Sequence, residues 1–188
     1  MPAFAPMPHD VQTERLLLRR CRPSDATDIR RLWAERDRRA RHLIDADGHP
    51  SVSEMRERIV AQLAEEERTG LALLAIERKP RPEFLGYCGL IAGAADEIEP
   101  EIAYELFRCA HGRGYATEAA RAVVEAARAT GRSRLWATVR EWNTTSFAVL
   151  AKLDFIDSGR RTPDPQRGDT VWMTRDLGEP LAQSGTTA

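Results

Sequence analysis

Two glycines around an arginine are the residues whose types and spacing point most directly to chemistry. Gly112 and Gly114 flank Arg113 between a strand-like segment and an alanine-rich helical segment, and Thr117 follows in the first helical turn. Such a junction presents several backbone N–H groups without an intrahelical partner, at the positive end of the helix dipole. Because glycine has no Cβ, a phosphate can approach this backbone closely. The pattern predicts a phosphate-binding loop; the alternative is that the glycines only permit a tight connection.

The loop matches neither of the common nucleotide-binding motifs. A Walker loop needs lysine and Ser or Thr after its glycines, and the segment HGRGYAT has no lysine. A dinucleotide fingerprint needs a third glycine where Thr117 stands, and it lies close to a first strand. A binder of nucleotide phosphates is therefore the weaker hypothesis.

Two carboxylates precede this loop on a segment that alternates like a strand. The alternation from Glu101 to Phe107 places Glu101 and Glu105 on the same face. A carboxylate on an open face can take a proton from an incoming ammonium group, directly or through a water molecule. For each carboxylate alone, a solvated position on a sheet face is the alternative.

A later segment, NTTSFAVLAKL, offers two more polar side chains at helical spacing. Asn143 and Ser146 lie three residues apart, so they share a face of a helix that begins there. Asn143 is also a good residue to cap that helix.

Cysteines and histidines show no spacing typical of a metal site. Cys21, Cys88 and Cys109 are far apart and form no C-x-x-C pair, which favours a reducing, cytoplasmic compartment. We expect no metal. Cys109 has no base beside it in the sequence, so an acyl-carrying role is not expected for it.

Length and charge limit the remaining possibilities. The chain has 188 residues, 42% of them hydrophobic, and a formal net charge of -1. This length suits one domain, which we expect over residues 1–177 with a flexible arm at 1–12, followed by a disordered tail at 178–188. The balanced charge gives no field that would favour nucleic acid or an anionic membrane. No apolar run is long enough to span a bilayer.

The phosphate-binding loop must be positioned by a mixed set of elements. Four helices are expected, beginning after Ser24 or Asp25, after Ser51, after the glycine loop, and at Asn143. The expected strands are 15–21, 71–77, 84–92, 101–107, 134–139, 156–159 and 170–175. Because strands and helices do not alternate strictly, the pattern favours a mixed α/β sheet.

Three blocks of the sequence together resemble a known family. These are TERLLLRR, EIAYELFRCAHGRGYATEA and ATVREWNTTSFAVLAKLDF. In this order they are similar to the GNAT superfamily of acyl-CoA-dependent N-acyltransferases, within it to the RimJ/RimL-type branch. The resemblance runs from about Thr13 to Arg175. It implies a twisted, mostly antiparallel central sheet with a splayed strand pair and flanking helices, and acetyl-CoA as co-substrate.

The resemblance also implies roles for individual residues. The pyrophosphate of acetyl-CoA would be held by Gly112, Arg113, Gly114, Tyr115 and Ala116, with Thr117 beside them. Free backbone at Leu106 and Phe107 would pair with the pantetheine arm or hold the acyl carbonyl oxygen. Asn143 would contact that arm, and the hydroxyl of Ser146 would lie near the sulfur and protonate or hydrogen-bond the thiolate. The alternative for Ser146 is an ordinary serine in the first helical turn. Glu101 would be the general base, in preference to Glu105.

The implied reaction moves an acetyl group to a primary amine by direct attack. The acceptor stays open between a protein N-terminus and a small-molecule amine, and a homodimer is one arrangement the chain could adopt. The alternative from a different class is a non-catalytic module that binds acyl-CoA for regulation or interaction.

Overall fold

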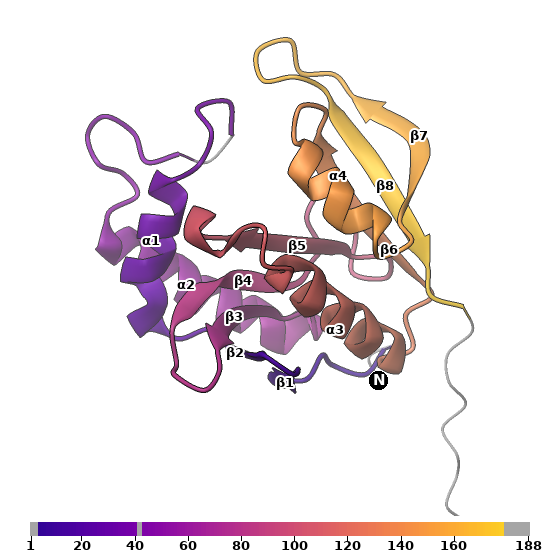
Figure 1. Ribbon diagram of the computed structural model, residues 1–188, viewed down its shortest axis with the longest axis horizontal. Helices are drawn as coiled ribbons and strands as arrows, with labels where there is room; N and C mark the ends of the chain where they lie inside the picture. Colours follow the sequence, from indigo (N-terminus) through magenta and orange to yellow (C-terminus); the bar gives the residue numbers. More distant parts are fainter. Residues whose placement is uncertain (1–3, 41–42, 179–188) are drawn as a thin grey trace, which may run out of the picture.

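The structure is a computed structural model that describes residues 4–40 and 43–178 (Figure 1). The described part of the chain forms one sheet of eight strands with order β1-β2-β3-β4-β5-β6-β8-β7. The strands are β1 (Asp10–Gln12), β2 (Leu16–Arg20), β3 (Leu73–Arg78), β4 (Phe84–Ile91), β5 (Glu101–Leu106), β6 (Arg134–Arg140), β7 (Ile156–Thr162) and β8 (Thr170–Asp176). The α-helices are α1 (Ala26–Ala34), α2 (Val52–Thr69), α3 (Tyr115–Ala129) and α4 (Thr144–Ala151). The expected mixed, mostly antiparallel sheet is thereby confirmed.

The sheet is split at its single parallel strand pair. All other neighbouring strands pair antiparallel, whereas β5 and β6 are parallel and are in register only at Glu101 and Trp136. Past this point the strands diverge, and α3 and α4 lie beside the opening (Figure 1). The structure thus contains the splayed pair that the family resemblance implies, and we call this opening the wedge.

Small side chains allow α3 to pack closely on the sheet. Ala119, Ala120, Val123 and Ala127 are fully buried in the main core with residues of β2 to β6. On the opposite face α1 and α2 cover a smaller core around Ile29 and Ile59. Burying apolar stripes on both faces fixes where the first turn of α3 stands relative to β5.

Two of the predicted helix caps are confirmed by their hydrogen bonds, whereas Asp25 precedes α1 without a side-chain capping bond. Ser51 and Glu54 form a reciprocal capping box, in which Glu54 N donates to Ser51 Oγ at 3.3 Å and Ser51 N donates to Glu54 Oε2 at 2.7 Å. Asn143 caps α4, because its Oδ1 accepts from Ser146 N at 3.2 Å.

The N-terminal segment differs from the expected flexible arm. Met7 is buried and its N–H donates to Gly70 O at 2.8 Å, and β1 pairs with β2. A three-residue strand is too short to show alternation, so its pairing partner decides its conformation. Residues 1–3 and most of the expected tail, 179–188, lie outside the described residues. Among the described helices none is both long and apolar enough to cross a membrane.

Candidate active site

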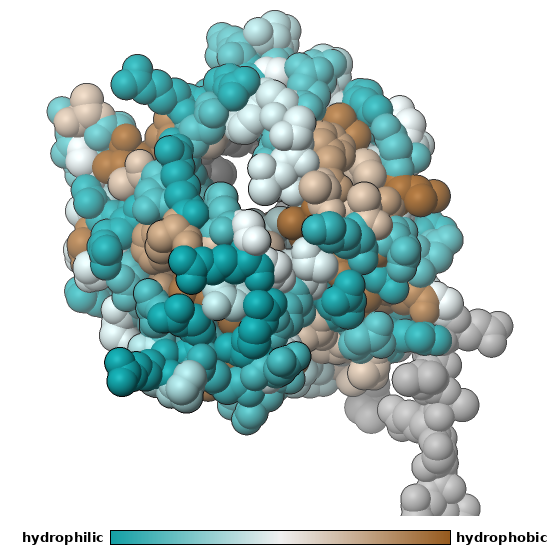
Figure 2. Space-filling model, in the orientation of Figure 1, coloured by the Kyte–Doolittle hydropathy of each residue, from teal (hydrophilic) through white to brown (hydrophobic). Residues whose placement is uncertain are grey.

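A cavity of about 660 Å³ opens at the wedge. Its wall is built from the end of α1 and the loop after it, from β5, from the glycine loop and first turn of α3, and from α4. Figure 2 shows the opening between the α1 side and the α4 side of the molecule. The segments that the sequence singled out, far apart in the chain, therefore border one space.

The glycine loop turns its backbone into this cavity. Gly112 and Gly114 have φ angles of 71° and 79°, a left-handed conformation that glycine adopts without steric cost. The first helical bond is made by Glu118 N to Gly114 O at 3.0 Å. Among the described residues, no acceptor lies within hydrogen-bonding reach of the six N–H groups from 112 to 117. A diphosphate fits such a set of unpaired donors at a helix N-terminus.

The residues expected to hold the phosphates are brought together, with one difference. The cavity wall includes Gly112, Gly114, Tyr115, Ala116 and Thr117. The side chain of Arg113 does not line the cavity within the described structure, and the Arg113 carbonyl accepts from Arg15 Nη1 at 3.0 Å.

Of the two residues expected to offer free backbone to the cofactor, Leu106 and Phe107, only Leu106 presents it at the open edge of β5. Phe107 N donates to Leu85 O at 2.9 Å, so this N–H points toward β4 and is already used. Because polar groups alternate sides along an antiparallel strand, Leu106 turns its N–H and C=O toward the wedge. Leu106 O accepts from His111 Nε2 at 2.9 Å. The proposed backbone role thus fits the Leu106 N–H, and the expectation for Phe107 is corrected.

Glu101 does not reach the cavity. Its side chain is buried beneath the loop that follows β4 and accepts from Ala94 N, from Ala95 N at 3.1 Å and from Thr138 Oγ1 at 2.7 Å. A carboxylate enclosed by three donors and shut off from the cavity is poorly placed to receive a substrate proton. The position of Glu101 therefore argues against the preferred general base.

Glu105 lines the cavity from the same face of β5. It accepts from Arg36 Nε at 2.7 Å, from Arg36 Nη2 and from the Tyr87 hydroxyl. Burial by itself lowers the pKa of Arg36, but the hydrogen bonds that Arg36 donates to Glu105 and the charges around it raise this pKa overall, so the guanidinium stays charged. Glu105 is thus the carboxylate that both lines the cavity and lies on β5.

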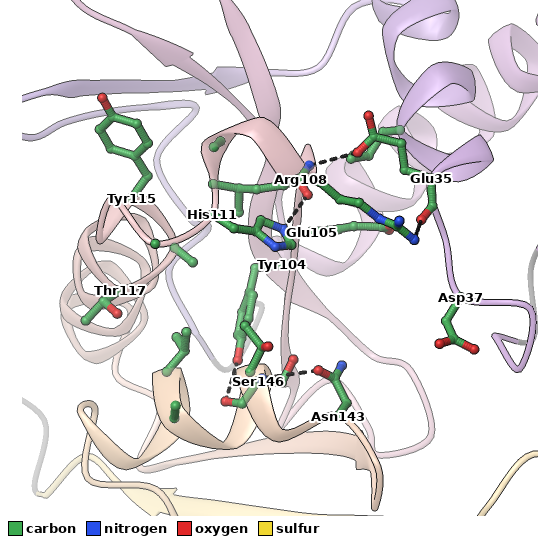
Figure 3. A pocket seen from close by; sticks show the side chains of 18 of the residues that line it. Glu35, Asp37, Tyr104, Glu105, Arg108, His111, Tyr115, Thr117, Asn143 and Ser146 are labelled. Carbon is green, nitrogen blue, oxygen red and sulfur yellow. Dashed lines mark hydrogen bonds between the residues drawn. The ribbon is translucent and has the colours of Figure 1, made fainter.

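Tyr104 is a cavity residue that the sequence analysis did not select. Its hydroxyl donates to Ser146 O at 3.2 Å, and it stands between Ser146 and His111 (Figure 3). Burial raises the pKa of Tyr104, so the hydroxyl stays protonated at neutral pH. Alternation places Tyr104 on the face opposite Glu105, yet both line the cavity because the strand ends inside the wedge. Ser146 and Asn143 also line it, as expected.

The wall opposite α4 is charged, and its residues were likewise missed. Arg108 N donates to Glu35 Oε2 at 2.8 Å and Arg108 Nη2 donates to Glu35 O at 2.6 Å (Figure 3). Asp37 lines the cavity on the same side. Across the opening the Arg39 guanidinium carbon lies 4.1 Å from the ring centroid of Trp142, which also lines the cavity. These contacts join loops distant in sequence, and no local motif marks them. In the described chain, no group of three His, Cys, Asp or Glu is arranged to hold a metal.

A split sheet whose wedge opens beside free N–H groups at a helix start is the arrangement that the resemblance to acyl-CoA-dependent transferases implies. The family model for the acetyltransferase (GNAT) domain matches residues 15–156. The chain therefore belongs to the GNAT acetyltransferase family.

Solved structures of similar fold agree with this assignment. RimJ from Mycobacterium smegmatis in complex with CoA-disulfide is 23% identical with a TM-score of 0.70, over 93% of this chain and 86% of that one. An acetyltransferase from Agrobacterium tumefaciens is 24% identical with a TM-score of 0.67, over 88% and 93%. The ribosomal-protein-S5-alanine acetyltransferase from Vibrio fischeri is 16% identical with a TM-score of 0.70, over 92% and 98%. No curated protein of matching sequence was found.

Proposed function

We propose that the protein transfers the acetyl group of acetyl-CoA to a primary amine by direct attack, without a covalent enzyme intermediate. The observation that carries the proposal is the row of N–H groups from 112 to 117 that have no acceptor in the described part of the chain and open onto the same cavity as the free edge of β5. The diphosphate would bind to these donors. The Leu106 N–H would hold the pantetheine arm or the acyl oxygen.

The chain supplies a group for the two proton transfers that the reaction depends on. Before attack the ammonium loses one proton. As the amine nitrogen then bonds to the acetyl carbon and the carbon–sulfur bond breaks, the thiolate gains a proton, and the nitrogen loses another that restores the donor's hydroxyl through water. Glu105, directly or through water, would receive the first. The Tyr104 hydroxyl, held beside Ser146 on α4, would donate the second, with the Ser146 hydroxyl as the other candidate donor.

The hydrogen bonds of Glu105 favour an acceptor amine of low pKa. Arg36 and Tyr87 already use much of the carboxylate's lone-pair capacity, so few sites are left to receive a proton. An α-amine, with a pKa of about 7.7 to 8.0, is partly neutral at pH 7, whereas a lysine side chain, with a pKa of about 10.4, is almost entirely protonated. We therefore favour a protein N-terminus, in keeping with the RimJ and S5-alanine acetyltransferase names of two similar structures.

A reducing, cytoplasmic compartment is part of the proposal. Cys21, Cys88 and Cys109 are all free thiols in the structure, and the first two are buried. Alkylation of the protein from a fresh lysate should modify all three after denaturation, and finding any of them in a disulfide would contradict this compartment.

An assay of thiol release from acetyl-CoA tests the function. Peptides with free α-amines, peptides with only lysine amines, and polyamines serve as acceptors. We expect turnover to be fastest with α-amine peptides. CoA binding without turnover on any amine would favour a non-catalytic acyl-CoA module, and absence of CoA binding would refute both.

A further inference from the structure

Thr13 and Arg15, just before β2, bind Glu118 in the first turn of α3, and we call this set of contacts the clamp. Thr13 Oγ1 donates to Glu118 Oε1 at 2.5 Å, and Arg15 N donates to the same oxygen at 2.9 Å. Arg15 Nε donates to Glu118 Oε2 at 2.6 Å. Burial raises the pKa of Glu118, but these bonds outweigh it and lower the pKa, so the carboxylate is ionised at neutral pH. The clamp joins segments about a hundred residues apart in the chain.

Arg15 also touches the glycine loop itself. Its Nη1 donates to Arg113 O at 3.0 Å, and its guanidinium carbon lies 4.7 Å from the centroid of the Tyr115 ring. A Cβ placed on Gly114 would stand 3.4 Å from Arg15 Nη2. Arg15 therefore contacts Arg113 and Tyr115 and lies beside Gly114 between them.

The bond to Arg113 O fixes the direction of a donor. In a planar trans peptide the C=O of one residue and the N–H of the next point in opposite directions. Because Arg15 holds the Arg113 carbonyl on its own side, the N–H of Gly114 points to the other side. That N–H is one of the unpaired donors, and Gly114 lines the cavity.

Arg15 also compensates a charge that opposes anion binding. Glu118 places a carboxylate in the first turn of α3, near the donors that a diphosphate would use. An unneutralised carboxylate there would repel the ligand. Arg15 lies 2.6 Å from it and supplies the opposite charge.

We propose that Arg15 is a positioning residue for the diphosphate: it orients the 113–114 peptide and neutralises Glu118 without being a catalytic residue. The inference rests on the proposed function, because it concerns how the same loop binds CoA. It assigns a task to the TERLLLRR block, whose role in the site nothing in the sequence reveals.

Replacing Arg15 by Gln tests this with two acetyl donors. Acetyl-CoA carries the diphosphate and acetylpantetheine does not. For Arg15→Gln we expect KM for acetyl-CoA and Kd for CoA to rise about tenfold or more, as for the loss of a charge-assisted hydrogen bond. We expect kcat at saturating acetyl-CoA, and kcat/KM for acetylpantetheine, to stay within about twofold. Adding Glu118→Gln to Arg15→Gln should recover part of the CoA affinity, because the repelling charge is gone.

Arg134→Gln is the matched control. The side chain of Arg134 is 41% exposed against 43% for Arg15, and it pairs with Glu99, just before β5, and with Asp176 at the end of β8, away from the glycine loop. It should leave both donors unaffected. Equal losses with both donors, or unchanged CoA affinity in Arg15→Gln, would overturn the inference while leaving the proposed function in place. A wild-type protein that binds no CoA would refute the proposed function, and the inference with it.

Discussion

Tyr104 and Ser146 are in contact inside the wedge, where β5 ends beside α4. The contact runs from the Tyr104 hydroxyl to the main-chain carbonyl of Ser146, so the side chain of Ser146 is not needed to hold Tyr104. Burial keeps the phenol protonated. A protonated, partly buried hydroxyl in the cavity is suited to giving a proton to a thiolate.

Removing this hydroxyl should therefore slow the chemical step. We expect Tyr104→Phe to lower kcat by about 100-fold or more, with little change in KM for acetyl-CoA. Ser146→Ala keeps the carbonyl that accepts from Tyr104, so its kcat should fall far less. Steady-state kinetics with both variants decides between the two hydroxyls, and the reverse order of effects would assign the proton to Ser146.

Substituting the two carboxylates of β5 should have different effects: Glu101 should matter for stability and Glu105 for activity. Glu101→Gln leaves buried donors such as Ala95 N with a weaker acceptor, so we expect unfolding free energy to fall by about 1–3 kcal/mol with kcat retained. Glu105→Gln should lower kcat. Urea unfolding and turnover are measured on both variants. Loss of turnover in a fully stable Glu101→Gln protein would contradict the positions argued above.

Strand alternation placed these two side chains on one face but could not rank them, and the family resemblance preferred Glu101, the carboxylate that does not reach the cavity. Strand alternation is a local rule, and it correctly paired Glu101 with Glu105. What separates them is the loop that carries Ala94 and Ala95, which folds over the first carboxylate. The contact of Arg36 with the second comes from a loop some 70 residues earlier, and neither contact has a local signal.

In the proposed function CoA binding depends on the glycine loop, and the conformation of its backbone and its contact with the ligand can be tested separately. Gly112 has a φ of 71°, and a Cβ there would meet nothing within 4 Å in the described structure. Gly112→Ala should therefore cost stability only through backbone strain, about 1–2 kcal/mol. The Cβ would stand where a phosphate approaches, so Kd for CoA should rise by clearly more than the strain explains.

Gly159 provides the control for that substitution. It has a φ of 78°, a Cβ there would also meet nothing within 4 Å of the described atoms, and it lies on β7, outside the cavity wall. Gly159→Ala should show the same loss of stability by thermal unfolding and no change in CoA titration. If both variants bind CoA like the wild type, the backbone of the loop does not meet the ligand.

Elements with local signals were predictable, and elements with distant partners were not. The caps Ser51 and Asn143 follow from side chains that bond to neighbouring N–H groups, and both are confirmed. The strand β1 was missed because Asp10–Gln12 is extended through pairing with β2. The wedge came only from the family resemblance, since single-point pairing of β5 with β6 leaves no pattern in either strand.

For the molecule as a whole, acid should weaken the fold through buried ion pairs. Asp25 is buried, which raises its pKa, but its bonds from Arg19 lower the pKa below the ordinary 3.8. A carboxyl group with a depressed folded-state pKa stabilises the fold above its unfolded pKa, and this contribution is lost as the pH falls through the folded value. Stability measured by urea unfolding should therefore be constant near pH 7 and decline below about pH 4.

The contribution of the Arg19–Asp25 pair can be tested by urea unfolding over the same range of pH. Asp25→Asn leaves Arg19 with one fewer charged partner in a buried site, so we expect a loss of about 3–5 kcal/mol at pH 7. The variant should lose less stability on acidification than the wild type. An identical pH dependence would show that this pair does not contribute to acid sensitivity.

The most direct test of the account is an amide titration of the ¹⁵N-labelled protein with CoA and, separately, with pantetheine. If the unpaired N–H groups bind the diphosphate, CoA should shift the amide signals of Gly112, Gly114, Ala116 and Thr117 strongly and saturably, whereas pantetheine should leave them nearly unchanged. Saturation with CoA while these four signals stay in place would contradict the central claim.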